Sequence, residues 1–317
     1  MPQNRVQFQQ GMSMIEFFDL YGTEQQCEAA LEEARWGRGF SCPKCGDSSY
    51  SRFDRNGKRI WQCTAHKHQS SLRTGSIFHA SRISLRNWFL AMFLTSQSKT
   101  NISALELKRH LGVSYPTAWL LKHKLMQTMA EREDKRRLSG RVVADDAYLG
   151  GVTTGGKRGR GAKQGGLFMA AVEVDADSLV RKVRFDVLPD MSGDSIRAWT
   201  RKALDGEVHL VTDGYSSLVA AISEIAEHEP IVVSPKKSSD FDCFRWVNVV
   251  IGNTKNSIRG AYHSFNVSKY ARRYLAEIQY RFNRRFALED LVPRLLYACA
   301  QNALRGLNML RSAELSC

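Results

Sequence analysis

Val142-Val143-Ala144-Asp145 places a carboxylate directly after an apolar run, and Val208-His209-Leu210-Val211-Thr212-Asp213 repeats the pattern. Short apolar runs predict buried β-strands, so each aspartate stands at the end of a strand. Two strand-end carboxylates that meet on neighbouring strands form a site for divalent metal and phosphate chemistry. This pair therefore predicts an enzyme that cuts and joins nucleic acid strands.

The elements around these two runs predict the fold. Strands are expected over 141–146, 167–175, 180–188, 208–212 and 231–233, with helices over 192–204 and 215–227 and another after the last strand. This order is typical of an α/β RNase-H-like fold, a mixed sheet flanked by helices whose first and fourth strands lie side by side. We therefore expect Asp145 and Asp213 to meet. Asp146 is the alternative to Asp145, because neighbouring side chains on a strand face opposite ways and only one would reach the metal.

A third ligand is expected on the helix that follows the fifth strand. Asn248 and Lys255 are seven positions apart, which places them on one face of a helix. The amide oxygen of Asn248 can bind Mg²⁺ or Mn²⁺ beside Asp145 and Asp213, and Lys255 can contact a phosphate. Glu277 and Asp242 are the alternatives for the third ligand.

Two short knuckles predict a second, structural metal site. Cys42-x-x-Cys45 and Cys63-x-x-His66 supply four ligands of the kind that tetrahedral Zn²⁺ prefers. His68 is a competing fourth ligand. A ribbon of about 30 residues buries little core, so metal binding would supply most of the free energy that folds it. The seven cysteines are odd in number and no export signal is recognised, so a disulfide framework is not expected.

The chain of 317 residues is long enough for two or three domains. The expected segments are an N-terminal helical segment over 1–37 (with a helix over 13–35), a zinc ribbon over 38–80, a helix-turn-helix-like region over 81–135, the RNase-H-like domain over 138–290 and a C-terminal helical tail over 291–317. The chain contains no apolar run of about 18 residues, so we expect no transmembrane helix and a cytoplasmic protein. That it is bacterial and nucleoid-associated is implied only by the family resemblance described below.

The charge distribution predicts a polyanionic partner. The net charge is +7 over residues 1–135, −1 over 136–243 and +8 over 244–317. Two basic flanks around a carboxylate-containing centre fit double-stranded DNA held beside a catalytic site.

The helix-turn-helix-like region is expected to place its second helix in the major groove. Its expected exposed residues are Tyr115, Thr117, Lys122, His123 and Lys124. Further DNA contacts are predicted in a glycine-rich loop (Lys157, Arg158 and Arg160) and on a basic helix (Arg272, Arg273, Arg281, Arg284 and Arg285), with a flexible linker and structural pairing as the respective alternatives.

The sequence resembles bacterial insertion-sequence transposases of the insertion-sequence-1595 family. The matching pieces are Arg35-Trp36-Gly37, Cys42-Pro43-Lys44-Cys45-Gly46, Thr74-Gly75-Ser76-Ile77-Phe78-His79, Asp145 to Gly151, Thr212-Asp213-Gly214-Tyr215, Gly260-Ala261-Tyr262-His263 and Tyr280 to Arg285. Each piece alone is modest, but together they are specific.

The resemblance implies a DDE-type catalytic domain behind a zinc ribbon. The family's third catalytic position is Glu, Asn or His followed by a Lys, which identifies Asn248 and Lys255 as its counterparts here. Two departures stand out: the usual Asp-Glu-Thr-Tyr is Asp-Asp-Ala-Tyr over 145–148, and the second knuckle, often Cys-x-x-Cys, ends in His66.

These expectations describe a transposase. It would bind the terminal inverted repeats of its element, hydrolyse a phosphodiester bond at each end and join the freed 3′-hydroxyl to target DNA, working as a dimer or higher oligomer. The alternative is a catalytically inactive DNA-binding protein that has kept the zinc and helix-turn-helix modules.

Overall fold

The computed structural model describes residues 10–150, 166–221, 227–232, 240–262, 265–303 and 305–312, and it divides into two compact units. The helical unit comprises Met1–Ser98, Ala104–Thr128 and Arg285–Leu310. The sheet unit comprises Lys99–Ser103, Met129–Arg284 and Arg311–Cys317. The chain thus enters each unit more than once, and the five-segment division expected from the sequence stays a prediction.

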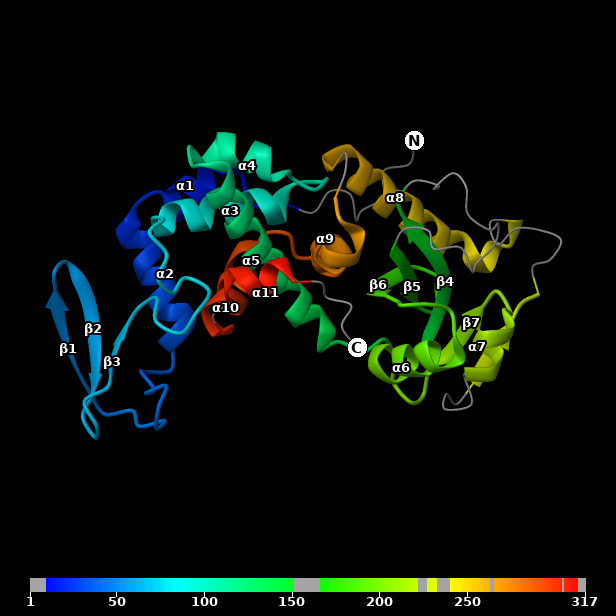
Figure 1. Ribbon diagram of the computed structural model, residues 1–317, viewed down its shortest axis with the longest axis horizontal. Helices are drawn as coiled ribbons and strands as arrows, with labels where there is room; N and C mark the ends of the chain where they lie inside the picture. The colour runs from blue at the N-terminus through cyan, green and yellow to red at the C-terminus, as the bar shows by residue number, and fades with distance from the viewer. Residues whose placement is uncertain are drawn as a thin grey trace. The chain divides into compact units, whose positions relative to one another are not determined.

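The helical unit holds a small antiparallel sheet and a group of helices (Figure 1). Its strands, in sheet order, are β1 (Tyr50–Arg55), β2 (Lys58–Cys63) and β3 (Gln69–Ser71). The helices are α1 (Met14–Tyr21), α2 (Glu24–Trp36), α3 (Leu85–Gln97), α4 (Ala104–Leu111), α5 (Tyr115–Asp134), which continues into the sheet unit, α10 (Leu291–Gln301) and α11 (Leu307–Arg311). Helix α10 packs against α2 and α3. No described helix is both long and apolar enough to cross a membrane.

The single helix expected over 13–35 is wrong, because the chain forms α1 and α2 with a break between them. Gly22 ends α1, where a Cβ would lie 2.2 Å from the carbonyl oxygen of Phe18. Thr23 then caps α2 in a capping box with Gln26, whose backbone N–H donates to the Thr23 hydroxyl. The apolar periodicity continues across this break, so periodicity alone did not reveal it.

The two helices of the predicted helix-turn-helix are present as α4 and α5. Between them Gly112 has a φ of +64°, a left-handed conformation that glycine adopts without steric cost. Its backbone N–H donates to the carbonyl oxygen of Lys108 at 3.0 Å and closes α4. The turn chemistry expected around Gly112 therefore ends the first helix where the sequence indicated.

The sheet unit is built on a five-stranded mixed sheet in the order β6-β5-β4-β7-β8. Its elements are β4 (Arg141–Leu149), β5 (Gly166–Val174), β6 (Val180–Val187), α6 (Gly193–Ala203), β7 (His209–Thr212), α7 (Ser216–Ala221), β8 (Glu227–Pro230), the 3-10 helix η3 (Asp242–Phe244), α8 (Arg245–Ala261) and α9 (Val267–Phe282). Strand β5 is antiparallel to both β4 and β6, whereas β7 runs parallel to β4 and to β8. This is the RNase-H-like arrangement that the order of elements predicted.

Helices cover both faces of this sheet, as Figure 1 shows for α6 on one side and α8 on the other. Strand β4 alternates between the two layers, because successive side chains of a strand face opposite ways. Val142 packs in the layer with Trp199 of α6, whereas Val143 packs in the layer with Val247 of α8 and Leu275 of α9. The sheet is therefore buried on both faces, and its open positions lie at the strand ends.

The fifth strand does not lie where the sequence indicated. The expected strand was the apolar triplet 231–233, but β8 spans Glu227–Pro230 and pairs with β7 at the edge of the sheet. An edge strand that is mostly exposed needs no apolar run, so the nearby triplet was a misleading signal. His228, half-buried on β8, lies 3.0 Å from the Thr212 hydroxyl, and burial lowers its pKa.

Candidate functional site

The helical unit brings four predicted metal ligands together. Cys42, Cys45, Cys63 and His66 each offer one ligand atom within 4.8 Å of the others. The Sγ atoms of Cys45 and Cys63 are 3.8 Å apart, and Nδ1 of His66 lies 3.7 Å and 3.2 Å from them. A tetrahedron with metal–sulfur bonds of about 2.3 Å has sulfur–sulfur edges of about 3.8 Å, so the spacing and the donor set fit Zn²⁺.

The two knuckles have the same backbone hydrogen bonds. In the first knuckle, the N–H of Cys42 donates to Asp47 O and the N–H of Gly46 donates to Cys42 O. In the second knuckle, the N–H of Cys63 donates to His68 O and the N–H of Lys67 donates to Cys63 O. In each knuckle the fourth residue after the cysteine is left-handed, with φ of +78° at Gly46 and +59° at Lys67. His68 thus closes the second knuckle through its carbonyl oxygen, while the ring of His66 meets the three thiols.

The local field of the first knuckle favours a thiolate. Desolvation opposes ionisation of the Cys42 thiol, but hydrogen bonds from the backbone N–H groups of Lys44 and Cys45, and from neighbouring thiols, lower its pKa overall. Thiolate is the form that binds metal. For the Cys45 thiol, a hydrogen bond from the Asp47 backbone N–H lowers the pKa, but desolvation and the same neighbouring thiols raise it overall, so the field favours one thiolate in this knuckle rather than two.

The sheet unit brings together the two aspartates that were expected at strand ends. Asp213 follows the end of β7, but the first strand is longer than the expected 141–146, so Asp145 lies in the middle of β4. Strands β4 and β7 are parallel, with Val142 level with Leu210 and Val143 level with Val211. The same register, extended by two positions, places Asp145 level with Asp213. Each side chain is only 8% exposed, and their carboxylates lie within 4.8 Å of each other. The expected meeting of these two residues is therefore confirmed.

Asp146 joins this cluster, which the sequence reasoning missed. Its carboxylate lies within 4.8 Å of both others, although strand alternation was expected to turn it away. Strand β7 pairs with β4 only as far as Val143, so Asp145 and Asp146 lie beyond the paired part of the two strands. The backbone N–H of Asp146 also donates to Asp145 Oδ1 at 2.9 Å. The sequence signal was the doubled aspartate itself.

A tight turn holds Asp213 at the end of β7. Gly214 has a φ of +71°, and a Cβ there would lie 3.3 Å from the carbonyl oxygen of Ile231. The N–H of Tyr215 donates to Asp213 Oδ1 at 3.3 Å, and the N–H of Ile231 donates to Thr212 O at 2.8 Å. The glycine is therefore required both by its backbone conformation and by the close approach of the next segment.

Asn248 and Lys255 both lie on α8, which packs against β4 and β5 in the same layer as Asp145. The Asn248 Nδ2 donates to Phe244 O at 3.1 Å, so the end of the amide that cannot bind a cation is held by its own helix. Both side chains are half-buried. Their joint position on one helix is as expected, and their roles stay predictions.

The two alternative third ligands lie elsewhere. Asp242 is exposed in η3, and Glu277 is fully buried on α9, where the Tyr262 hydroxyl donates to it at 3.1 Å. Burial, with the nearby Glu277 charge, raises the pKa of Tyr262 well above its ordinary value, so this phenol stays protonated. Among the described residues, neither carboxylate belongs to the cluster around Asp145.

The predicted exposure of the second helix of the helix-turn-helix is wrong for its cationic turn. Lys122, His123 and Lys124 are all buried. The ammonium of Lys124 donates to Ile77 O at 3.0 Å and lies 5.8 Å from the ring centre of Trp88, and burial lowers its pKa. These side chains stabilise the helical unit rather than face solvent.

Several arginines predicted to follow DNA are likewise buried on or after α9. Arg273, Arg281 and Arg284 are each at most 9% exposed. Arg281 donates to Thr100 O at 2.7 Å, and Arg284 pairs with the buried Glu133 at 2.6 Å. The contacts of Arg281 and Arg284 are the structural pairing that was the alternative to phosphate binding.

Of the remaining predicted DNA contacts, some lie outside the described residues and others are placed by the structure. Lys157, Arg158 and Arg160 lie outside the described residues. Arg285 is half-buried, with its guanidinium 4.1 Å from the ring centre of Phe286.

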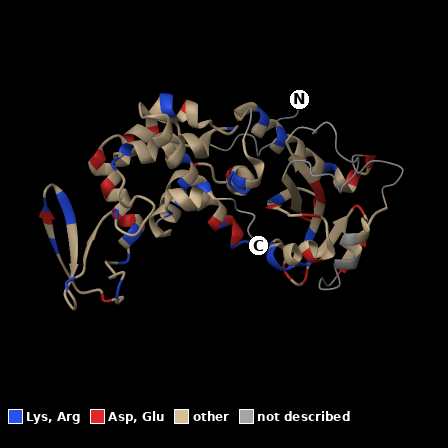
Figure 2. Ribbon diagram, in the orientation of Figure 1, with Lys and Arg blue, Asp and Glu red and all other residues tan. Residues whose placement is uncertain are grey.

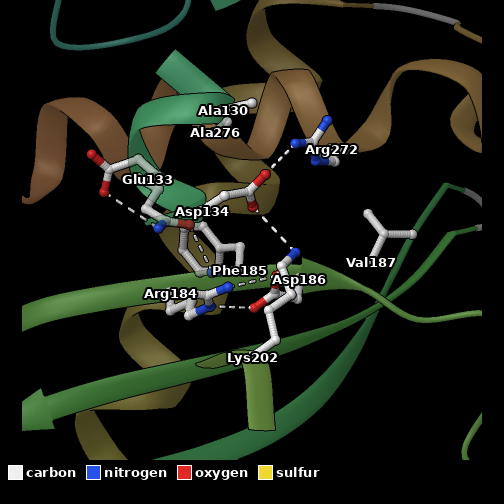
Figure 3. A pocket seen from close by; sticks show the side chains of 11 residues that line it. Ala130, Glu133, Asp134, Arg184, Phe185, Asp186, Val187, Lys202, Arg272 and Ala276 are labelled. Atoms are coloured by element: carbon white, nitrogen blue, oxygen red, sulfur yellow. Dashed lines mark hydrogen bonds and ion pairs between the residues drawn. The ribbon is translucent and has the colours of Figure 1, made fainter. Parts of the chain in front are cut away.

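Arg272 belongs to a ladder of charges in a pocket at the β6 edge of the sheet (Figure 3). It pairs with Asp134, which also accepts from Lys202 at 3.1 Å. Lys202 in turn lies 2.9 Å from Asp186, and Arg184 lies 2.6 Å from the same carboxylate. Burial would raise the pKa of Asp186, but the two cations lower it below its ordinary value. This ladder ties the end of α5 to β6, α6 and α9.

A zinc-type cluster and an RNase-H-like sheet that brings carboxylates of two neighbouring strands together are typical of the class of DDE-type transposases. Residues 137–283 match the ISXO2-like transposase domain, and residues 22–69 match the transposase zinc-ribbon domain. The chain belongs to the IS1595 family of transposases.

A curated relative is the uncharacterized protein in transposable element ISH50 of Halobacterium salinarum (strain ATCC 700922 / JCM 11081 / NRC-1). It is 26% identical over 148 residues, which is 46% of this chain and 48% of the relative, so the match spans about half of each.

Two solved structures are weakly similar to this chain. They are the Mos1 transposase paired-end complex with left transposon end (TM-score 0.20, 14% identity, 62% of this chain and 75% of that chain) and the Mos1 mariner paired end complex with Mn (TM-score 0.20, 13% identity, 68% and 79%). Similarity at this level carries no argument about the site.

Proposed function

We propose that this protein is a metal-dependent DNA transposase. It hydrolyses a phosphodiester bond at each end of an insertion sequence and then joins the freed 3′-hydroxyl to target DNA. The observation that supports this most directly is the β4–β7 register, which places Asp145 level with Asp213 at one end of the sheet. Asp145 interrupts the apolar strand β4, and Asp213 directly follows the apolar strand β7, so neither charge serves the packing of the core.

The donor set of this cluster fits a hard divalent cation. Asp145, Asp213 and the amide oxygen of Asn248 would hold Mg²⁺ or Mn²⁺, with Asp146 close enough to contribute a further oxygen. When bound, such a cation activates the attacking oxygen and stabilises the leaving oxygen at phosphorus. Carboxylates this close repel one another, so a cation between them also relieves a repulsion that the fold otherwise bears.

The protein's own groups position the substrate. The Lys255 ammonium, on the same helix face as Asn248, would hold a phosphate oxygen of the scissile or neighbouring group. In hydrolysis, water attacks phosphorus and the 3′-oxygen leaves as a 3′-hydroxyl. In joining, that 3′-hydroxyl attacks a target phosphodiester, and the target's own 3′-oxygen leaves. No external energy source is needed, because one phosphodiester bond replaces another.

The zinc ribbon would serve recognition rather than chemistry. Zn²⁺ held by Cys42, Cys45, Cys63 and His66 has all four positions filled by protein, which is typical of a structural site. The ribbon and the helix-turn-helix would bind the terminal inverted repeats of the element. Because two ends must be cut and joined together, two or more copies of the chain would assemble on them.

The test is cleavage of labelled duplex DNA that spans the boundary of the element, in Mg²⁺ and in Mn²⁺. We expect nicking at the boundary by the wild type and at least a 100-fold loss in Asp145→Ala, with DNA affinity kept, because catalytic metal sites supply several kcal/mol to the transition state. Glu207→Ala, an exposed acid at the opposite end of β7, is the matched control. Tight boundary binding with no cleavage in either metal would refute the proposal and favour the inactive DNA-binding alternative.

A further inference from the structure

Helix α8 carries a stripe of residues longer than the Asn248–Lys255 pair. At 3.6 residues per turn, five residues fall within about 80° of one another around the helix. They are Arg245, Asn248, Gly252, Lys255 and Arg259. The buried residues of α8 lie on a different face: Val247, Val250, Ile251, Thr254 and Ile258. The stripe therefore flanks the packed face along the length of the helix.

The charges of this stripe are unusual for a helix. Arg245, Lys255 and Arg259 are its only charged residues, all are basic, and Figure 2 shows α8 without an acidic position. In the part of the chain that the structure describes, none of the three makes an ion pair. Arg245 and Arg259 are exposed, and Arg245 lies 5.4 Å from the ring centre of Trp246. Within the described residues, the stripe thus presents cationic charge that no ion pair neutralises.

The placement of the three cations destabilises the helix in two ways. Arg245 is in the first turn, where the helix dipole disfavours a cation, and no acidic residue offsets it there. Lys255 and Arg259 are a like-charge pair four residues apart, which also destabilises a helix. Charges that destabilise a helix and have no partner within the protein are expected where a bound ligand supplies the opposite charge. A polyanion along the stripe would relieve both.

The middle of the stripe is open to close approach. A Cβ built on Gly252 meets no atom within 4 Å, so packing does not require glycine there. Glycine within a helix is unfavourable relative to almost any other residue. It does, however, let another backbone come close to the helix axis. Gly252 lies between Asn248, which is proposed to bind the cation, and Lys255, which is proposed to bind a phosphate.

We propose that this stripe is the track that holds the DNA strand on either side of the scissile phosphate. Arg245 and Arg259 would each bind a flanking phosphate, and Gly252 would give the sugar–phosphate backbone room to approach. The stripe spans about 21 Å at 1.5 Å per residue, which matches roughly six base-pair steps of 3.4 Å. The inference rests on the proposed function, since it assumes that DNA is the substrate of the adjacent cluster.

The first test measures how salt weakens binding of the boundary duplex by the full chain, without divalent metal. Each phosphate contact contributes about 0.9 to the slope of log affinity against log salt. Removing two contacts in Arg245→Ala/Arg259→Ala should therefore lower the slope by about 1.8, so that between 50 and 200 mM salt the wild type weakens about 12-fold more than the variant. Arg201→Ala, an exposed arginine on α6 across the sheet, is the control. A double variant with the slope of the control would overturn the proposal.

The second test uses the glycine. Gly252→Gln should raise the thermal midpoint, because glutamine favours the helix, yet weaken binding of the boundary duplex about tenfold or more by blocking the track. Gly206→Gln, at an equally open position before β7, should leave the affinity unchanged. Unchanged affinity in Gly252→Gln would overturn the role of this residue.

The outcomes separate this inference from the proposed function. Cleavage by the wild type together with an unchanged salt slope in the double variant overturns the track alone. A wild type that binds the duplex but never cuts it overturns the proposed function, and the salt slope still decides whether the stripe contacts DNA.

Discussion

The matched knuckles of the zinc ribbon allow a reciprocal test of the reasoning. Gly46 and Lys67 occupy equivalent positions, each in the left-handed region, and each closes its knuckle with the same backbone hydrogen bond. A non-glycine residue pays about 1–2 kcal/mol for this conformation. Glycine offsets part of the gain because it loses about 0.5–1 kcal/mol more conformational freedom on folding. We therefore expect a net difference of about 1 kcal/mol at each position.

The two substitutions should act in opposite directions. Because zinc binding and ribbon folding are coupled, about 1 kcal/mol is roughly a fivefold change in zinc affinity. Lys67→Gly should tighten zinc about fivefold, and Gly46→Lys should weaken it about fivefold. A Cβ on Gly46 meets no described atom within 4 Å, so the effect is backbone strain and not a clash.

The assay is competition for zinc against a chelator of known affinity, with the full chain at constant pH. Lys67→Ala serves as the control, because it removes the side chain but keeps a Cβ in the left-handed conformation. If Lys67→Gly binds zinc no more tightly than Lys67→Ala, the strain reasoning is refuted.

Three further predictions follow. His66→Ala should lose the ribbon zinc, whereas His68→Ala should keep one zinc per chain, because His68 contributes its carbonyl oxygen and not its ring. Atomic absorption measures the zinc content of both variants. Equal loss of zinc in both would contradict this assignment. Gly214→Ala should cost about 1–2 kcal/mol of unfolding free energy and slow DNA cleavage, because it strains the turn that holds Asp213, the proposed metal ligand. Asp186→Asn should cost about 3–5 kcal/mol near pH 7, because it strands the buried Arg184 guanidinium. Since the pKa of Asp186 is lowered on folding, its contribution is present above the unfolded pKa of about 3.9 and is lost as pH falls through the lower folded pKa. Denaturant unfolding of wild type and variant from pH 3 to 7 should show a constant gap above about pH 5 that narrows below about pH 4; a gap independent of pH would count against the ion pair.

Much of the site could be predicted from the sequence, because the patterns that indicate it are formed by residues close together in the chain. The four zinc ligands come in two short knuckles, and the chemistry of the ligands restricts the metal. Asp145 and Asp213 each follow an apolar run in the sequence, so the order of elements was enough to predict that they meet, although β4 continues past Asp145 to Leu149. The apolar triplet at 231–233 shows where this reasoning fails, since an edge strand needs few apolar residues and β8 formed before it.

The buried lysines and arginines show this limit of sequence-based prediction more clearly. Lys124 and Arg284 look like DNA contacts in a basic sequence, but they are buried against Ile77 O and Glu133. Burial depends on which elements pack together, and no spacing along the chain reports it. Asp146 was expected only as an alternative to Asp145, because side chains alternate along a strand, but the carboxylates of both lie in the cluster with Asp213.

The sequence by itself was enough to predict the four clustered residues of the zinc ribbon, the meeting of Asp145 with Asp213, the order of the strands and the family, because knuckles and apolar runs are properties of neighbouring residues. The tertiary structure decided three things: that the register places Asp145 level with Asp213, that many arginines and lysines serve the core, and that α8 leaves three cations along one side. The physical reason is that charge acts through space and burial, so a basic residue's role is set by what packs around it rather than by its neighbours in the chain.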